Sequence, residues 1–351
     1  MNKKKFLLVI FILLFGMGGY RAGGMVHFAF FPYQTSPENQ ETISIPRGLS
    51  PYELSQQLQK KKLISSARRF YWLGKALGHW PKMKAGDYEI SSSQSPLEIF
   101  ALIQTGLSKN YPVTFQEGKN RYQFAEILES KGLGKKENYL TLCKDKSFLN
   151  SMDLPKETPS CEGYLFPETY QFPKSLSEKQ ILITLISRFK KNWTLEFQQR
   201  AQQIKMTQHQ IITLASIVEK ETGASEERPL ISSVFHNRLK KKMRLQSDPT
   251  TIYGIWENFN GNLQKKHLFE KNNYNTYKIK GLPIGPIANP GLKAIEAALY
   301  PATSSYLYFV SKNDGTHYFS KTITEHNQAV RKYQLNSKAR EGKSWRDLHQ
   351  R

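Results

Sequence analysis

The chain has 351 residues, of which 39% are hydrophobic and 12% aromatic, enough for two or three folded domains and too apolar for a disordered chain. Lys and Arg number 51 against 29 Asp and Glu, a net charge of +22, so an anionic partner is expected. Nucleic acid is not expected as that partner, because the basic residues form short dispersed runs such as 60–62 and 240–242 and follow an export signal.

Three lysines at positions 3–5 precede an apolar run from Phe6 to Tyr20. This pattern is typical of a signal peptide or an uncleaved signal anchor, and a buried N-terminal helix is the third alternative. We favour the anchor, because Arg21 interrupts the small residues that a signal peptidase would cut. Residues 1–31 are therefore predicted to form a cytoplasmic start and a single transmembrane anchor, and the polar, proline-containing residues 32–41 a linker. The rest of the chain would then lie on the outer side of the inner (cytoplasmic) membrane.

Residues 42–108 predict a small β-α-α-β-α module, with a strand before Gly48, helices beginning at Ser50-Pro51 and Ser95-Pro96, and a strand ending in AGDYEIS. The sequence VTFQEGKNRYQFAEILESKG (113–132) then echoes ISIPRGLSPYELSQQLQKKK (43–62), with Gly118 in the place of Gly48. The echo indicates that one strand-glycine-helix unit is used twice, and chance similarity is the alternative.

Residues 109–351 predict a larger domain. It contains a long helical stretch over 177–203, a helix from Gln208 to about Thr222, Gly/Pro-rich turns at 245–255 and 281–291, and a strand at 306–312. Helices mixed with short strands, without βαβ alternation, indicate an α+β fold. Cys143 and Cys161 could form a disulfide in an exported chain or remain unpaired. No metal or cofactor is expected, because neither cysteine has metal-ligand neighbours.

Glu219 lies on the apolar face of the helix predicted to begin at Gln208. At about 100° per residue it falls between Ala215 and Ile212, whereas Glu221 lies at the other edge of the apolar arc and Lys220 points outward. A carboxyl on an apolar face loses hydration, which raises its pKa toward the range that a general acid needs. A buried glutamate in a structural salt bridge is the alternative.

Polar side chains on the nearby turns are candidate substrate-binding residues. Hydroxyl, amide and carboxyl groups on Gly/Pro-shaped turns suit sugar hydroxyls and amides, although the same residue types also serve as turn and helix caps. The candidates are Gln246, Ser247, Asp248, Thr250, Tyr253 and Asn289.

Several motifs together resemble one family. EGYLFPETY, ASIVEKET, FHNRL with MRLQSDPTTIYG, YNTY with GLPIGPIANPG, and HYFSKTITEHN occur in that order behind the predicted anchor. The set is similar to the endolytic murein transglycosylase (YceG-like) family over nearly the whole chain, while the spacer between Ile255 and Tyr274 departs from it. The resemblance implies that residues 42–108 are LysM-like and that 109–351 form a catalytic transglycosylase domain.

The resemblance also implies a mechanism. Glu219 would be the catalytic acid and base that cleaves the β-1,4 bond between N-acetylmuramic acid and N-acetylglucosamine within peptidoglycan strands, leaving 1,6-anhydro ends and limiting strand length. Peptidoglycan synthases are candidate partners. Two alternatives stay open: a hydrolytic muramidase that uses Asp248 as a second carboxylate, and a noncatalytic wall-binding protein. A buried unpaired glutamate would be costly in a pure binder.

Overall fold

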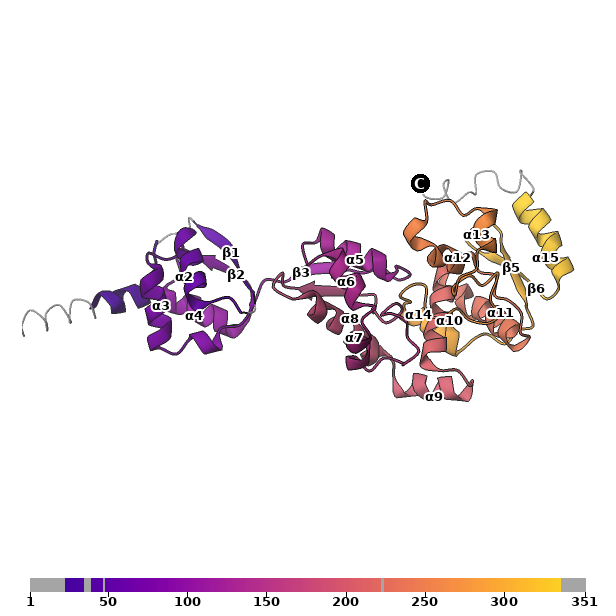
Figure 1. Ribbon diagram of the computed structural model, residues 1–351, viewed down its shortest axis with the longest axis horizontal. Coiled ribbons are helices and arrows are strands. Elements are labelled where there is room, and N and C mark those ends of the chain that lie inside the picture. Colours follow the sequence, from indigo (N-terminus) through magenta and orange to yellow (C-terminus); the bar gives the residue numbers. More distant parts are fainter. Residues whose placement is uncertain (1–22, 35–38, 47, 222–223, 336–351) are drawn as a thin grey trace, which may run out of the picture. The chain divides into compact units, whose positions relative to one another are not determined.

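The computed structural model describes residues 23–34, 39–46, 48–221 and 224–335 (Figure 1). These residues form two compact units, one up to Pro112 together with Tyr170–Ser177, the other comprising Val113–Thr169 and the chain from Glu178 onward. The first division falls close to the predicted boundary at 108/109, whereas the assignment of Tyr170–Ser177 to the first unit has no counterpart in the sequence prediction. Mixed helices and small sheets confirm the α+β class.

The first unit has the predicted β-α-α-β-α order. Its elements are β1 (Gln40–Ile45), α2 (Pro51–Lys60), α3 (Ala67–Ala76), the short 3-10 helix η1 (Trp80–Lys82), β2 (Gly86–Ser91) and α4 (Pro96–Thr105). β1 begins inside the predicted 32–41 linker and pairs antiparallel with β2, so that Ile43 faces Tyr88. Capping boxes at Ser50 and Ser95, each followed by proline, start α2 and α4 where the sequence predicted them. That this module is LysM-like stays a prediction.

The predicted anchor falls largely outside the described residues. Residues 23–30 are helical, and Phe28 and Ala29 of this helix join the core of the first unit with Ile43, Leu54 and Tyr88. Among the residues that the structure describes, none of the helices has the length and apolar character needed to cross a bilayer.

Two short strands contain the boundary between the units: β3 (Tyr111–Thr114) pairs with β4 (Thr169–Phe172). The first helices of the second unit are α5 (Arg121–Ser130), α6 (Lys136–Leu142), α7 (Lys146–Ser151), α8 (Glu178–Asn192) and α9 (Leu195–Gln203). The predicted long helix over 177–203 is divided, because the side chain of Thr194 caps the N-terminus of α9. A disulfide joins Cys143 and Cys161, which decides the question that the sequence left open.

The rest of the second unit surrounds α10 (Gln208–Glu221). It contains η2 (Ser225–Glu227), α11 (Arg228–Lys240), α12 (Asp248–Gly254), η3 (Trp256–Asn258), α13 (Lys265–Phe269), α14 (Leu292–Leu299), β5 (Tyr308–Ser311), β6 (His317–Ser320), α15 (Ile323–Val330) and the π-helical turn η4 (Arg331–Leu335). β5 and β6 form an antiparallel hairpin. α10 packs against α9, α11, α12 and α14, and every residue from Ile211 to Val218 is buried. The last turn of this central helix carries both candidate glutamates.

The internal echo is present in the structure. α2 and α5 have the same length at an offset of 70 residues, both begin with a capping box, and Gly48 and Gly118 both have positive φ, at 86° and 75°. Positive φ is readily adopted by glycine, which explains why the two turns share this residue. The strand-glycine-helix unit is therefore used twice, although β1 pairs with β2 and β3 with β4.

Candidate active site

Glu219 is held by two partners on one side of α10. Its Oε1 accepts a hydrogen bond from Arg228 Nη2 at 2.9 Å, and its Oε2 accepts one from the backbone N–H of Gly291 at 3.0 Å. Its side chain is 6% exposed, and Arg228 also lies 3.8 Å from Glu117. Burial raises the pKa of Glu219, and the Gly291 N–H and the Arg228 guanidinium oppose that rise. Both carboxylate oxygens are thus occupied by groups of the chain itself.

Two glycine turns close over Glu219. Gly118 lies against it, and a Cβ at this position would stand 3.5 Å from Glu219 Cγ, in ordinary contact. Gly291 caps the N-terminus of α14, and a Cβ there would collide with the Glu117 carboxylate. The second copy of the strand-glycine-helix unit and the 281–291 loop therefore meet at Glu219.

Glu221 faces a different part of the unit. Its Oε1 accepts a hydrogen bond from Ser247 Oγ at 2.5 Å, and Arg238 lies close enough to lower its pKa. Burial is nevertheless the dominant effect and raises the pKa of Glu221 to about 7, with a further rise from the neighbouring charge of Asp248. The prediction that Glu219 and Glu221 do not form a side-by-side acid pair agrees with these separate partners.

Glu221 lines a cavity of about 320 Å³, a volume at the lower end of small-ligand sites, which run from roughly 300 to 1,000 Å³. Polar and aromatic side chains from four parts of the unit line it: Arg238, Gln246, Asp248, Tyr277, Tyr308 and His326, with Phe235, Leu245, Phe309 and Ile323 as the apolar part. Tyr277 donates a hydrogen bond from its hydroxyl to Asp248 Oδ1 at 2.7 Å. This cavity gathers ionisable and aromatic groups around one carboxyl whose pKa is near neutral.

The predicted substrate-binding residues occupy two distinct places. Gln246 and Asp248 are exposed and line the Glu221 cavity. Ser247 donates to Glu221, and the buried Thr250 donates to the backbone oxygen of Ser247 at 2.6 Å, so these two residues fix the turn from within.

Tyr253 and Asn289 instead hold a third glutamate. Glu162 is completely buried and accepts hydrogen bonds from Tyr253 at 2.9 Å and from Asn289 Nδ2 at 3.0 Å, as well as from the backbone N–H of Arg121. Asn289 Oδ1 accepts from the backbone N–H groups of Gly163 and Leu165. Burial raises the pKa of Glu162 to about 7, opposed by Arg121. Because Asn289 is also fully buried, the geometry favours a structural role for it over substrate contact.

Three residues near the candidate glutamates were not predicted from the sequence. Arg228, Arg238 and His326 each reach a candidate glutamate or its cavity. Arg238 and His326 lie inside quoted motifs, FHNRL and HYFSKTITEHN, so charged residues in those motifs were the available signal. Within the described part of the chain, no group of three or more His, Cys, Asp or Glu side chains is placed to hold a metal ion.

A helix-borne carboxyl whose pKa is raised by burial has the property that a general acid needs. The profile of the YceG-like family matches residues 43–332. An endolytic murein transglycosylase of Bacillus subtilis is 33% identical to this chain, and the match covers 86% of this chain and 87% of the relative. An endolytic murein transglycosylase of Streptococcus pneumoniae is 28% identical, and the match covers 94% of this chain and 65% of the relative. The crystal structure of a YceG-like protein from Listeria monocytogenes, 36% identical, covers 84% of this chain and all of that one at a TM-score of 0.58. The chain belongs to the YceG-like family.

Proposed function

We propose that this chain is an endolytic lytic transglycosylase that cleaves the β-1,4 bond between N-acetylmuramic acid and N-acetylglucosamine inside peptidoglycan strands. The naming of the Bacillus subtilis and Streptococcus pneumoniae relatives supports the activity. The observation that carries the chemistry is the buried carboxyl of Glu219 at the end of α10, oriented by hydrogen bonds from Arg228 and Gly291. Cleavage within strands limits their length, which makes peptidoglycan synthases candidate partners.

Two glutamates compete for the role of proton donor. The helical wheel and the family resemblance assign Glu219, whereas the cavity geometry favours Glu221. Glu219 accepts one hydrogen bond at each oxygen, from Arg228 and Gly291, and keeps a second lone pair on each, whereas Glu221 accepts one from Ser247 and lines the cavity. A general acid must reach the glycosidic oxygen with its own O–H. We assign proton donation to Glu219, as predicted from the sequence, because burial raises its pKa while Arg228 and Gly291 fix its orientation, and Glu221 is the alternative donor.

The reaction then needs one carboxyl. Glu219 gives its proton to the glycosidic oxygen as the bond from that oxygen to C1 of the muramoyl residue breaks. The resulting carboxylate accepts the proton of the C6 hydroxyl while O6 bonds to C1, which closes the 1,6-anhydro ring and restores the acid. Because the attacking group is tethered to the sugar, it gains an effective molarity that reaches roughly 10⁵ M or more in well-oriented cases, and no water is consumed.

A hydrolytic muramidase is the second candidate, because Asp248 lines the same cavity as Glu221. A hydrolase would use this second carboxylate as base or nucleophile. The hydrogen bond that Asp248 accepts from Tyr277 instead suits a residue that shapes the cavity and tunes the pKa of Glu221.

Mass spectrometry of muropeptides released from purified sacculi tests the function. We expect 1,6-anhydro ends from the unmodified chain and from Asp248→Asn, and a loss of activity of about 10² to 10⁴ in Glu219→Gln, which keeps the shape but cannot donate the proton. Glu221→Gln, on the same turn of α10, is the matched comparison and should keep most of the activity. Activity in folded Glu219→Gln with none in Glu221→Gln would move the assignment to Glu221. Borohydride-reducible ends, absent in Asp248→Asn, would establish the muramidase.

Attachment to the outer face of the inner membrane is a further part of the proposal. It is supported by the sequence of residues 3–20, lysines followed by an apolar run, and by the helix at 23–30. One side of this helix joins the core of the first unit through Phe28 and Ala29, while Val26, Phe30 and Phe31 are 59%, 64% and 57% exposed. Exposed aromatic residues next to an apolar run suit the interface of a bilayer.

A further inference from the structure

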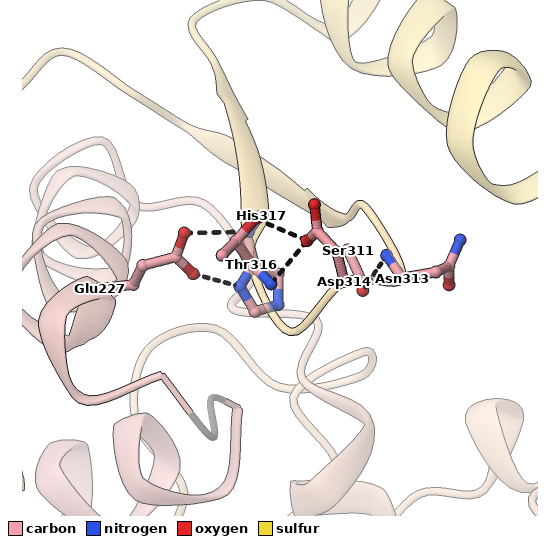
Figure 2. Close-up of polar contacts among 6 residues, drawn as sticks. All are labelled: Glu227, Ser311, Asn313, Asp314, Thr316 and His317. Atoms are coloured by element: carbon pink, nitrogen blue, oxygen red, sulfur yellow. Dashed lines mark hydrogen bonds and ion pairs between the residues drawn. The ribbon is translucent and has the colours of Figure 1, made fainter. Parts of the chain in front are cut away.

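Two groups orient the carboxyl of Glu219, and each is anchored elsewhere in the second unit. Arg228, which donates to Oε1, lies at the start of α11 directly after Glu227. Glu227 accepts hydrogen bonds from the backbone N–H of His317 at 3.0 Å and from its Nδ1 at 2.7 Å, so the β5–β6 hairpin holds this side (Figure 2). Gly291, which donates to Oε2, has a different anchor.

Glu162, in the EGYLFPETY motif, is a buried carboxyl that the proposed proton transfer does not use. It is completely buried and accepts hydrogen bonds from the backbone N–H of Arg121, at 3.0 Å to Oε1 and 2.9 Å to Oε2. Oε2 also accepts from the Tyr253 hydroxyl at 2.9 Å, and Oε1 from Asn289 Nδ2 at 3.0 Å. Because a carboxylate without water is costly unless its donors stay in place, Glu162 fixes the groups around it.

Asn289 is held by its whole side chain. Its Nδ2 donates to Glu162 and to the backbone oxygen of Lys119, the latter at 3.1 Å. Its Oδ1 accepts from the backbone N–H groups of Gly163 at 2.9 Å and Leu165 at 3.1 Å. The amide therefore joins the EGYLFPETY motif to the 281–291 loop.

The backbone of Asn289 is bonded to one of the two glycine turns beside Glu219 and continues into the other. Its N–H donates to the backbone oxygen of Lys119 at 3.0 Å, and its own oxygen accepts from the N–H of Gly118 at 3.0 Å. Gly291 follows Asn289 by two residues, and the residue between them is a proline, whose φ is fixed. A displacement of Asn289 would therefore move the Gly291 N–H relative to Glu219.

We propose that Glu162 is a positioning residue for the proton transfer, because through Asn289 its carboxylate keeps the Gly291 N–H aligned with Oε2 of Glu219. This inference rests on the proposed function, in which Glu219 must point at the glycosidic oxygen. Glu162 acts only through Asn289, so it is not itself a catalytic residue.

Steady-state kinetics of Glu162→Gln on purified glycan strands test this role. Gln keeps the size of the side chain but replaces one acceptor oxygen with an NH2 group that faces donors. We expect kcat to fall about tenfold to a hundredfold, the effect of a small misplacement, with KM changed less than about twofold. The fall in kcat/KM that accompanies loss of the Glu219 proton should move about 0.5 to 1 unit to higher pH, because the Gly291 N–H lowers the pKa of Glu219.

Asn275→Ala is the matched control for Asn289→Ala. Asn275 is also a completely buried asparagine, and its Nδ2 donates to the backbone oxygen of Glu270 at 2.7 Å, so the variant loosens the segment around α13. Both variants should lower the unfolding midpoint, but only Asn289→Ala should shift the pH midpoint in the same direction as Glu162→Gln. An unmoved pH midpoint in folded Glu162→Gln, or an equal shift in Asn275→Ala, would overturn the role.

Nuclear magnetic resonance gives a readout that needs neither turnover nor a variant of Glu162. In the full chain carrying Glu219→Gln, the proton donor no longer titrates, so the Gly291 amide signal can be compared with the carboxyl carbon signal of Glu162. Burial raises the pKa of Glu162 to about 7, and we expect the Gly291 amide to shift with the same midpoint. A Gly291 amide that does not follow Glu162 would overturn the coupling.

The outcomes separate from those of the proposed function. A Gly291 amide that follows Glu162 in a chain that yields no anhydro ends would retain the coupling and reject the reaction. Anhydro ends that are lost in Glu219→Gln, together with independent Gly291 and Glu162 signals, would retain the reaction and reject the positioning role.

Discussion

At the scale of single residues, the site depends on what surrounds each carboxyl of α10. Burial raises the pKa of both Glu219 and Glu221, but Glu219 is held by Arg228 and Gly291, whereas Glu221 lines the cavity of about 320 Å³. A general acid must be protonated to act, so kcat/KM should be constant at pH values below the raised pKa of Glu219 and fall about tenfold per pH unit above it. A pH-rate profile on purified glycan strands measures this decrease in kcat/KM.

Two neighbours of Glu219 should move the pH midpoint of that fall in kcat/KM in opposite directions. The charge of Glu117 raises the pKa of Glu219, so Glu117→Gln should shift the midpoint to lower pH. Arg228 lowers the same pKa, so Arg228→Gln should shift it to higher pH. If both variants left the midpoint in place, another group would control it and Glu219 would lose its role.

At the scale of elements, two glycine turns and one disulfide hold the chain around α10. The disulfide between Cys143 and Cys161 lies next in sequence to Glu162, whose carboxylate holds Asn289 of the 281–291 loop. It closes a loop with a sequence separation of 18, for which chain entropy predicts a stabilisation of about 3 kcal/mol. We expect Cys143→Ser/Cys161→Ser to lose about this much in denaturant unfolding. The unmodified chain under reductant should match the variant, and an unchanged midpoint in both would mean that this disulfide does not stabilise the fold.

At the scale of the whole molecule, the exposed face of the 23–30 helix predicts where the first unit meets a membrane. A polarity-sensitive fluorophore on Phe30→Cys can be attached selectively, because both native cysteines are in the disulfide. In vesicles of anionic phospholipid the full chain should show a blue-shifted label quenched by brominated acyl chains, since aromatic residues at such a position enter the interface. Leu107→Cys, at a site 76% exposed in the same unit, is the control. Equal quenching at both positions, or none at Phe30, would argue against this face.

The sequence by itself determined the local structure and the family. Serine caps followed by proline, and glycines at positive φ, act within a few residues, so the β-α-α-β-α order, the repeated strand-glycine-helix unit and the start of α10 were all predicted. The ordered motifs, which carry the family resemblance, likewise need no coordinates. The sequence also indicated candidate binding residues on the 245–250 turn, and two of them, Gln246 and Asp248, line the cavity.

Only the tertiary structure decided which surroundings each glutamate has. A helical wheel gives an angle around the axis and assumes one buried side, whereas α10 is buried all round from Ile211 to Val218 and meets different neighbours on each side. Glu219 meets Arg228 and Gly291, and Glu221 meets Ser247 and the cavity wall formed by β5 and α15. These partners lie up to about 100 residues away along the chain, and their arrangement depends on packing between elements, which no local pattern encodes.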